Sequence, residues 1–124
     1  MSARSANLKI LIVDDHAGMR GIVRRTCAGL AHEFIECDNG DDAVKAFTQH
    51  APDWVIMDVQ MHGMDGLKAT ETIHLLDANA RIIVISQFSE PEYRDQARRA
   101  GAVEFVSKED MSQLVDIICS QPPL

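Results

Sequence analysis

Three short apolar runs constrain the fold of this chain more than any other feature of its sequence. They cover residues 8–13, 53–57 and 81–86, and each consists mainly of aliphatic or β-branched side chains. Near-continuous apolar runs of this length are typical of parallel strands that are covered on both faces. Weaker strand patterns cover residues 32–37 and 102–106. The runs therefore predict one parallel sheet buried between two outer layers.

Stretches with helical periodicity separate these runs. In the first stretch, apolar side chains recur at helical spacing from Met19 to Leu30, and arginines occupy the opposite side. Further helices are predicted after residues 39–42, over residues 67–76, from a capping box at Ser89 to Gly101, and over residues 111–118. Strands that alternate with helices predict an α/β fold in which helices cover both faces of a doubly wound parallel sheet.

The length of the chain bounds its domain organisation. Its 124 residues suffice for one domain and are too few for two. We expect a flexible N-terminal tail over residues 1–7 and the folded domain over residues 8–120. Residues 121–124 contain two prolines, so we expect a tail or the start of a linker there.

Charge and cysteine content narrow the classes of function. Acidic residues outnumber basic residues by 19 to 12, and the net charge is −7. This charge argues against nucleic-acid binding by the chain itself and favours a cation or a partner with a basic face. The three cysteines include no CxxC pair, and no apolar run reaches the about 18 residues of a membrane span. We therefore expect a cytoplasmic protein with reduced thiols and no membrane contact.

Polar residues follow the predicted strands at the points where the strands end. Asp14 and Asp15 follow the first run, Asp58 follows the second, Ser86 ends the third, and Lys108 follows the last strand. Any one of these aspartates alone is more often a turn or cap residue. Ligands of open α/β sheets, however, bind beyond the carboxyl ends of the strands. If the first and third strands are neighbours, three carboxylates meet there, which one lysine does not balance. This predicts a Mg²⁺ site.

These residues belong to a longer pattern. It reads Asp14-Asp15-His16, then Asp58-Val59-Gln60-Met61 and Met64-Asp65-Gly66, then Ser86, then Phe105-Val106-Ser107-Lys108. This pattern resembles the receiver domain of two-component response regulators, and the resemblance extends over residues 8–120. The resemblance implies a flavodoxin-like (βα)5 fold, with a five-stranded parallel sheet in the strand order 2-1-3-4-5.

The resemblance also implies a role for each acidic residue. Asp58 would be the phosphoacceptor and would form an acyl phosphate. Asp15 would bind Mg²⁺ directly, Asp14 would bind it mainly through water, and Asp58 and the backbone carbonyl of Gln60 would complete the protein ligands. The ion would balance the charge that develops on the phosphoryl oxygens during transfer.

Three further residues have roles that the resemblance implies. Ser86 and Lys108 would each contact a phosphoryl oxygen and so take part in catalysis. Ser86 and Phe105 would form the conformational switch. Phe105 occupies a position where many receivers have a tyrosine, so it lacks the hydroxyl group of the usual switch residue.

The function implied is that of a phosphorylation-controlled switch. The domain would accept a phosphoryl group from a histidine kinase or a histidine phosphotransfer protein. It would then regulate a partner or a fused, DNA-binding output domain through the face of the fourth helix, the fifth strand and the fifth helix. Such a domain is not an enzyme in the usual sense, although it would catalyse its own phosphorylation and dephosphorylation.

Three other functions are open on the sequence. A Mg²⁺-dependent phosphohydrolase with an aspartyl nucleophile needs a second carboxylate two residues on, where this chain has Gln60. A flavodoxin-like protein needs a phosphate-binding loop, and no glycine-rich loop follows the first strand. A degenerate receiver that serves only for docking is disfavoured, because the acidic residues, the serine and the lysine are all present.

Three residues near the site depart from the usual pattern or bear on access to it. His62 stands where the family often has a proline, and Gln87 stands where a small residue is typical. Phe88 lies two residues after the hydroxyl residue, and we expect its bulk to shield the acyl phosphate from water.

Overall fold

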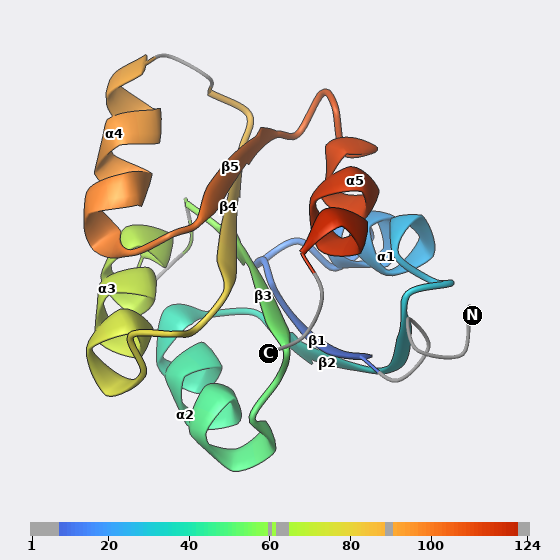
Figure 1. Cartoon of the computed structure of the whole chain (residues 1–124), viewed down its shortest axis with the longest axis horizontal. Helices are drawn as coiled ribbons and strands as arrows, with labels where there is room; N and C mark the ends of the chain where they lie inside the picture. The colour runs from blue at the N-terminus through green and yellow to red at the C-terminus, as the bar shows by residue number, and fades with distance from the viewer. Residues whose placement is uncertain (1–7, 60, 62–64, 89–90, 122–124) are drawn as a thin grey trace.

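Five parallel strands form one sheet at the centre of the molecule (Figure 1). The structure is a computed structural model that describes residues 8–59, 61, 65–88 and 91–121. The strands are β1 (Leu8–Val13), β2 (Ala31–Cys37), β3 (Trp54–Asp58), β4 (Ile82–Ser86) and β5 (Glu104–Ser107). Their spatial order is β2-β1-β3-β4-β5, and all neighbours run parallel. The expected strand order is therefore confirmed.

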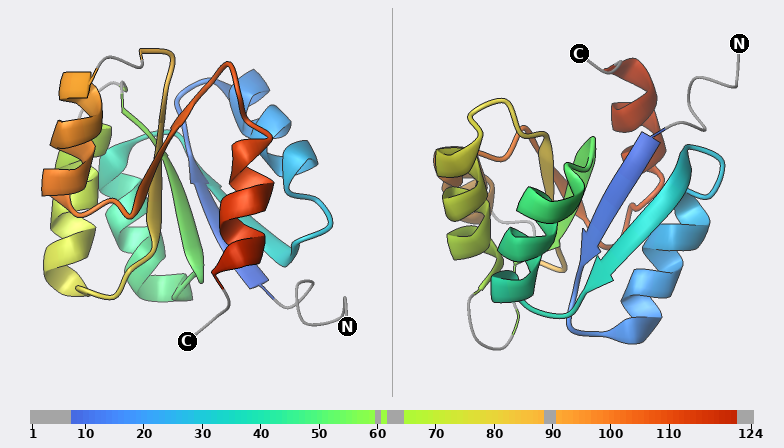
Figure 2. Two further views of the ribbon diagram at one scale, coloured as in Figure 1. Left: turned by 45° about the horizontal axis from the view of Figure 1, so that its top comes forward. Right: turned by 90° about the horizontal axis from the view of Figure 1, so that it is seen from below.

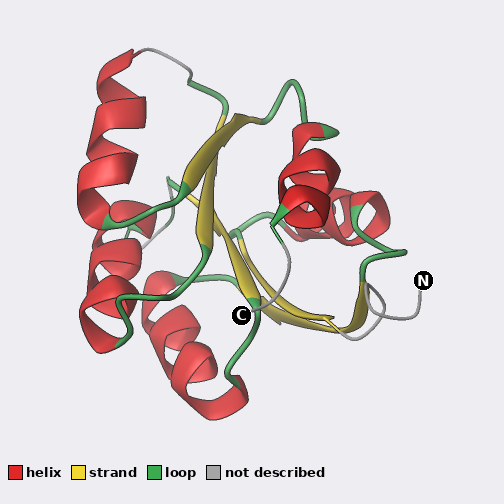
Figure 3. Cartoon of the chain, viewed as in Figure 1, coloured by secondary structure: helices red, strands yellow, loops and turns green. Residues whose placement is uncertain are grey.

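Helices cover both faces of this sheet. They are α1 (Ala17–Thr26), α2 (Gly40–His50), α3 (Gly66–Leu76), α4 (Pro91–Ala100) and α5 (Gln113–Ser120). Figures 1 and 2 show α1 and α5 on one face and α2, α3 and α4 on the other. The colouring by secondary structure in Figure 3 shows strands only in the middle layer. The molecule is thus a doubly wound α/β sandwich of three layers.

The apolar runs are buried because both faces of the sheet are covered. Every residue of β3 and β4 is buried. Along β3, Val55 and Met57 belong to the cluster that packs against α2, α3 and α4, while Trp54 and Ile56 belong to the cluster on the side of α1 and α5. Successive side chains of a strand point to opposite faces, so an unbroken apolar run serves two cores at once.

Capping side chains and a glycine mark the ends of three helices. The side chains of Asn39 and Asp65 cap α2 and α3 by accepting from the backbone N–H groups of Asp42 and Lys68, each at 2.8 Å. Gly101 follows α4 with φ +113°, a left-handed conformation that strongly favours glycine. The predicted capping box begins at Ser89, which lies outside the described residues.

The observed boundaries differ from the sequence expectation by a few residues. The largest difference is at α1, which ends at Thr26 rather than continuing to Leu30. Cys27 and Leu30 are nevertheless buried. The apolar spacing marked the buried positions Val23, Cys27 and Leu30, but it also included Ile22, which is 40% exposed, and the helix ends inside the pattern.

The three cysteines are free thiols in the structure. Cys27 is buried, and its pKa is raised to about 11 by burial and, to a smaller extent, by the nearby thiol of Cys119. Within the described part of the chain, no helix combines the length and the apolar character that a membrane crossing requires. The expected tails, residues 1–7 and 122–124, lie outside the described residues.

Candidate functional site

Polar side chains gather where β1, β3 and β4 end. Asp14 follows β1, Asp58 is the last residue of β3, and Ser86 is the last residue of β4. The parallel register brings these ends to one edge, because Val13 pairs with Met57 and Asp58 pairs with Ile85. Asp14, Asp58 and Ser86 are 0%, 3% and 2% exposed, so they form a buried polar group beside an apolar core. Their predicted convergence is confirmed.

Lys108 joins two of these carboxylates. Its Nζ lies 3.0 Å from Asp58 Oδ1 and 3.2 Å from Asp14 Oδ2, although it comes from the end of β5. Burial alone would lower the pKa of Lys108, but the hydrogen bond and charge of Asp58, with those of Asp14, raise it above its ordinary value. The ammonium group therefore stays charged and balances part of the negative charge.

Residues at the start of α1 contact Asp14 and the neighbouring Asp15. The backbone N–H of His16 donates to Asp14 Oδ1 at 2.9 Å, and His16 Nδ1 lies 3.0 Å from Asp15 Oδ1. Arg20 Nη1 donates to the backbone carbonyl of Asp14 at 2.7 Å. His16 lies at the rim of the site with its side chain exposed. The sequence did not predict the contact of Arg20, because it is made to a backbone carbonyl outside α1 and no residue spacing signals it.

The donor set fits a small divalent cation. Ligand atoms of Asp14, Asp15 and His16 all lie within 4.8 Å of one another. Asp58 adds a third carboxylate close by, and the ion pairs of Lys108 with Asp14 and Asp58 supply one positive charge to this group. Carboxylate oxygens are the ligands that Mg²⁺ prefers in proteins. Gln60, the fourth expected ligand, lies outside the described residues, as does His62.

A small pocket opens beside Asp58. It has a volume of ≈ 70 Å³ and is lined by His16, Asp58, Ser86, Gln87 and Lys108. Gln87 is exposed at its rim, while the other strand-end groups are largely buried. The backbone N–H of Lys108 donates to the carbonyl of Ser86 at 2.8 Å, which ties the ends of β4 and β5 together. The pocket thus presents a carboxylate, a hydroxyl and an ammonium group to one small volume.

Gly66 supports the back of the site. Its N–H donates to the carbonyl of Val59 at 3.0 Å. A Cβ atom added at Gly66 would collide with the backbone carbonyl of Asp58. Glycine is therefore required for the close approach of α3 to the end of β3. The sequence motif includes Gly66, but its contact with the end of β3 depends on how α3 lies in the fold and gave no signal in the sequence.

Phe88 does not cover the pocket in the way its bulk suggested. Its ring stacks on Tyr93 of α4, with ring centroids 5.7 Å apart and an angle of 24° between the planes. The described side chains that line the pocket come from other positions. The expectation that Phe88 shields the site is therefore not supported.

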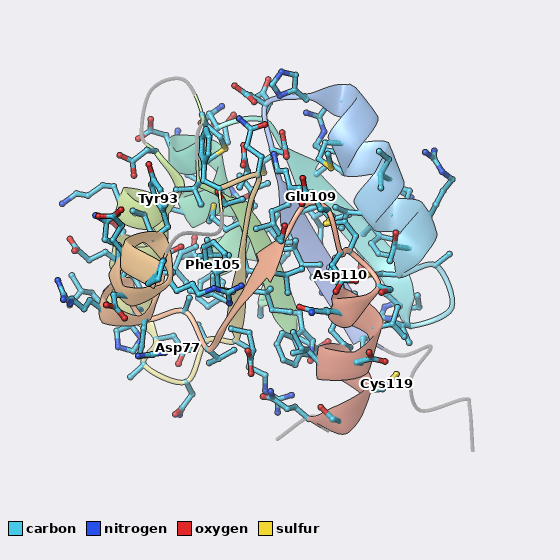
Figure 4. The ribbon with its side chains drawn as sticks, turned by 90° about the horizontal axis from the view of Figure 1, so that it is seen from above. Asp77, Tyr93, Phe105, Glu109, Asp110 and Cys119 are labelled. Carbon is cyan, nitrogen blue, oxygen red and sulfur yellow. The ribbon has the colours of Figure 1, made fainter. Side chains whose placement is uncertain are left out.

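Phe105 is a core residue whose ring also contacts a charged side chain. It is 8% exposed, and the guanidinium of Arg94 lies 4.8 Å from the centre of its ring. In Figure 4 Phe105 lies on β5 and Tyr93 lies on α4. Two consecutive residues of α4, Tyr93 and Arg94, thus contact the loop after β4 and the strand β5 respectively.

Known proteins share this arrangement. The family model described as "Response regulator receiver domain" matches residues 10–119. Chemotaxis protein CheY of Bacillus subtilis (strain 168) is 40% identical over 101 residues, which are 81% of this chain and 84% of that protein.

Two solved structures of response regulators are similar to this chain in fold. A two-component response regulator of the LuxR family from Aurantimonas sp. has a TM-score of 0.84 and 29% identity, covering 92% of this chain and 84% of that one. The CheX-CheY-BeF3-Mg+2 complex from Borrelia burgdorferi has a TM-score of 0.84 and 25% identity, covering 97% of both chains. Since the family model covers nearly the whole folded sheet and its helices, the chain belongs to the response regulator receiver domain family.

Proposed function

We propose that this domain accepts a phosphoryl group on Asp58 from a histidine kinase or a histidine phosphotransfer protein. The observation that carries this proposal is the position of Asp58. It ends a central strand, it lines the small pocket, and its Oδ1 lies 3.0 Å from Lys108 Nζ. An ionised carboxylate held beside a cation is a suitable nucleophile for phosphoryl transfer.

The transfer needs little from the protein beyond position and charge. An oxygen of Asp58 forms a bond to phosphorus, the phosphorus–nitrogen bond to the donor histidine breaks, and the donor imidazole takes up a proton. Lys108 changes partner from the carboxylate to a phosphoryl oxygen, and the hydroxyl of Ser86 donates to another. Groups fixed in this way stabilise the charge that spreads over the phosphoryl oxygens.

We assign the Mg²⁺ of this reaction to Asp14, Asp15 and Asp58, with the backbone carbonyl of Gln60. Bound there, the ion neutralises phosphoryl charge during transfer. Two observations support the assignment: the clustered ligand atoms of Asp14 and Asp15, and the Mg²⁺ named in the complex of the related CheY from Borrelia burgdorferi. Asp14 holds its place through the His16 N–H, so the carboxylate is oriented before an ion arrives.

The proposed consequence is a change at the face of α4, β5 and α5, through which a partner or a fused output domain is regulated. Ser86 and Phe105 form the switch, because Ser86 faces the pocket and Phe105 packs beneath α4. In this role the domain acts as a phosphoacceptor switch in the cytoplasm rather than as an enzyme with an external substrate.

Phosphorylation with a small-molecule donor tests the acceptor. With acetyl phosphate and Mg²⁺, the intact protein should gain the mass of one phosphoryl group, and peptide mapping should place it on Asp58. Asp58→Asn should abolish the gain. Asp53→Asn is the matched control, since Asp53 precedes β3 at its opposite end and is exposed. Modification of Asp58→Asn at the wild-type rate would refute the proposal.

Calorimetric titration tests the metal assignment separately. Asp15→Asn should weaken Mg²⁺ binding about tenfold or more, because a carboxylate ligand is replaced by a neutral amide. Asp53→Asn should leave the affinity unchanged. Equal losses in the two variants would show that the ion binds elsewhere.

A further inference from the structure

Among the residues that the structure describes, the hydroxyl of Ser86 has a backbone donor on its acceptor side. Its Oγ accepts a hydrogen bond from the backbone N–H of Phe88 at 3.0 Å. Ser86 is 2% exposed, so bulk water does not orient this group. A hydroxyl accepts through its lone pairs and donates through a single O–H. With the N–H of Phe88 on the acceptor side, the O–H is left to donate into the pocket that Ser86 lines with Asp58.

The residue that donates this hydrogen bond also packs against α4 through its side chain. The ring of Phe88 stacks on the ring of Tyr93, at a centroid distance of 5.7 Å. Tyr93 is half-buried against the core cluster on the side of α2, α3 and α4, and Ala97 and Ala100 anchor the same helix in that layer. Offset ring pairs of this geometry attract each other beyond simple area burial.

From these contacts we propose that Tyr93 is a positioning residue for phosphoryl transfer, which orients the Ser86 hydroxyl through Phe88. The proposal rests on the proposed function of Asp58. Tyr93 touches neither the pocket nor a phosphoryl group. Tyr93 holds Phe88 in place, so that the backbone N–H of Phe88 stays within hydrogen-bond distance of Ser86 Oγ.

This path differs from the contact between α4 and β5. Arg94, the next residue, lies over the ring of Phe105, and that contact does not include Ser86 or Phe88. Loss of the Tyr93 ring should therefore act first on the loop after β4. The two contacts can be separated experimentally, because each depends on a different side chain of the same turn.

Amide hydrogen exchange in the unmodified protein tests the first step. Tyr93→Leu keeps apolar bulk but removes the ring, and it should speed exchange of the Phe88 amide by about threefold to tenfold. Tyr93→Phe keeps the stacking and should restore the wild-type value. Phe34→Leu is the matched control, since it removes an aromatic contact with Arg24 on the opposite side of the sheet. It should leave the Phe88 amide unchanged.

The phosphorylation rate tests the second step. With acetyl phosphate and Mg²⁺, Tyr93→Leu should slow phosphorylation by about threefold to tenfold, and Tyr93→Phe should not. In a Ser86→Ala background, Tyr93→Leu should have no further effect, because the group that it orients is gone. An equal slowing in both backgrounds would show that Tyr93 acts by another route and would overturn the proposal.

The failure of this proposal is distinguishable from failure of the function on which it rests. If the wild-type protein is phosphorylated on Asp58 and Tyr93→Leu reacts at the same rate, only the role of Tyr93 is overturned. If the wild-type protein is not phosphorylated, the proposed function falls, and the role of Tyr93 falls with it. Phe88→Leu removes the other ring of the pair and should reproduce both effects of Tyr93→Leu.

Discussion

Lys108 links three residues that come from three different strand ends. Its side chain contacts Asp14 and Asp58, while its backbone N–H donates to the carbonyl of Ser86. A phosphoryl group on Asp58 that drew the ammonium away would weaken the pair with Asp14 and strain the link to Ser86. Lys108 is thus placed so that a change of charge on Asp58, at the end of β3, affects the position of Ser86, at the end of β4.

Gly66→Ala should destabilise the protein by about 2–4 kcal/mol, because its Cβ would collide with the backbone carbonyl of Asp58. Urea unfolding followed by circular dichroism measures this loss. The variant should also be phosphorylated more slowly, since relief of the collision moves the end of β3.

Gly18→Ala provides the control for this prediction. Gly18 lies in α1, and an added Cβ there meets nothing within 4 Å. Alanine should therefore leave stability unchanged or raise it by up to about 1 kcal/mol. Equal stability of Gly66→Ala and the wild-type protein would contradict the close approach of α3 to β3.

At the scale of elements, an ion-pair group fastens α1 to β2. Arg20 Nε and Arg24 Nε donate to the two carboxylate oxygens of Glu36 at 3.0 Å and 2.9 Å. Burial alone would raise the pKa of Glu36, but the hydrogen bonds and charges of both arginines lower it below its ordinary value. Arg20 also donates to the carbonyl of Asp14, so this group reaches the backbone of the site.

The pH dependence of this group follows from the lowered pKa. Its contribution is present above the ordinary carboxyl pKa and is lost as the pH falls through the lowered pKa of the folded state. Glu36→Gln should cost about 0.5–1 kcal/mol at pH 7, because the group is partly exposed. The difference from the wild-type protein should shrink in acid unfolding titrations below about pH 4.

Glu104→Gln is the matched control for Glu36→Gln, since Glu104 is an exposed strand residue at the far edge of the sheet. It should change stability by less than about 0.5 kcal/mol across the same pH range. A Glu36→Gln variant whose deficit stays constant down to low pH would contradict the ion-pair account.

At the scale of the whole molecule, the site meets the proposed output face of α4, β5 and α5 at the end of β5, because Lys108 directly follows that strand. Phosphorylation should therefore perturb backbone amide signals over residues 86–108 more than over residues 33–50. The change need be only a shift between two conformations that already exist. Two-dimensional NMR before and after addition of acetyl phosphate and Mg²⁺ measures it, and perturbations confined to α2 would exclude this face.

Much of the architecture could be predicted because it depends on local patterns. The apolar runs marked the strands, and the strand ends placed Asp14, Asp58 and Ser86 at one edge. Gly66 and Tyr93 could not be assigned their contacts, because these depend on how α3 and α4 lie against loops distant from them in sequence. The end of α1 was misplaced for a related reason: Cys27 and Leu30 stay buried without being helical.

The burial of Trp54 determines what intrinsic fluorescence can report in this protein. Trp54 is the only tryptophan of the chain and is 0% exposed. It begins β3 while Asp58 ends it, a separation of roughly 13 Å along an extended strand. Indole emission should therefore follow unfolding with a large red shift and respond little to ligands at Asp58. Binding studies at the site will therefore need a probe other than Trp54 fluorescence, whereas denaturation studies can use this fluorescence to follow unfolding alone.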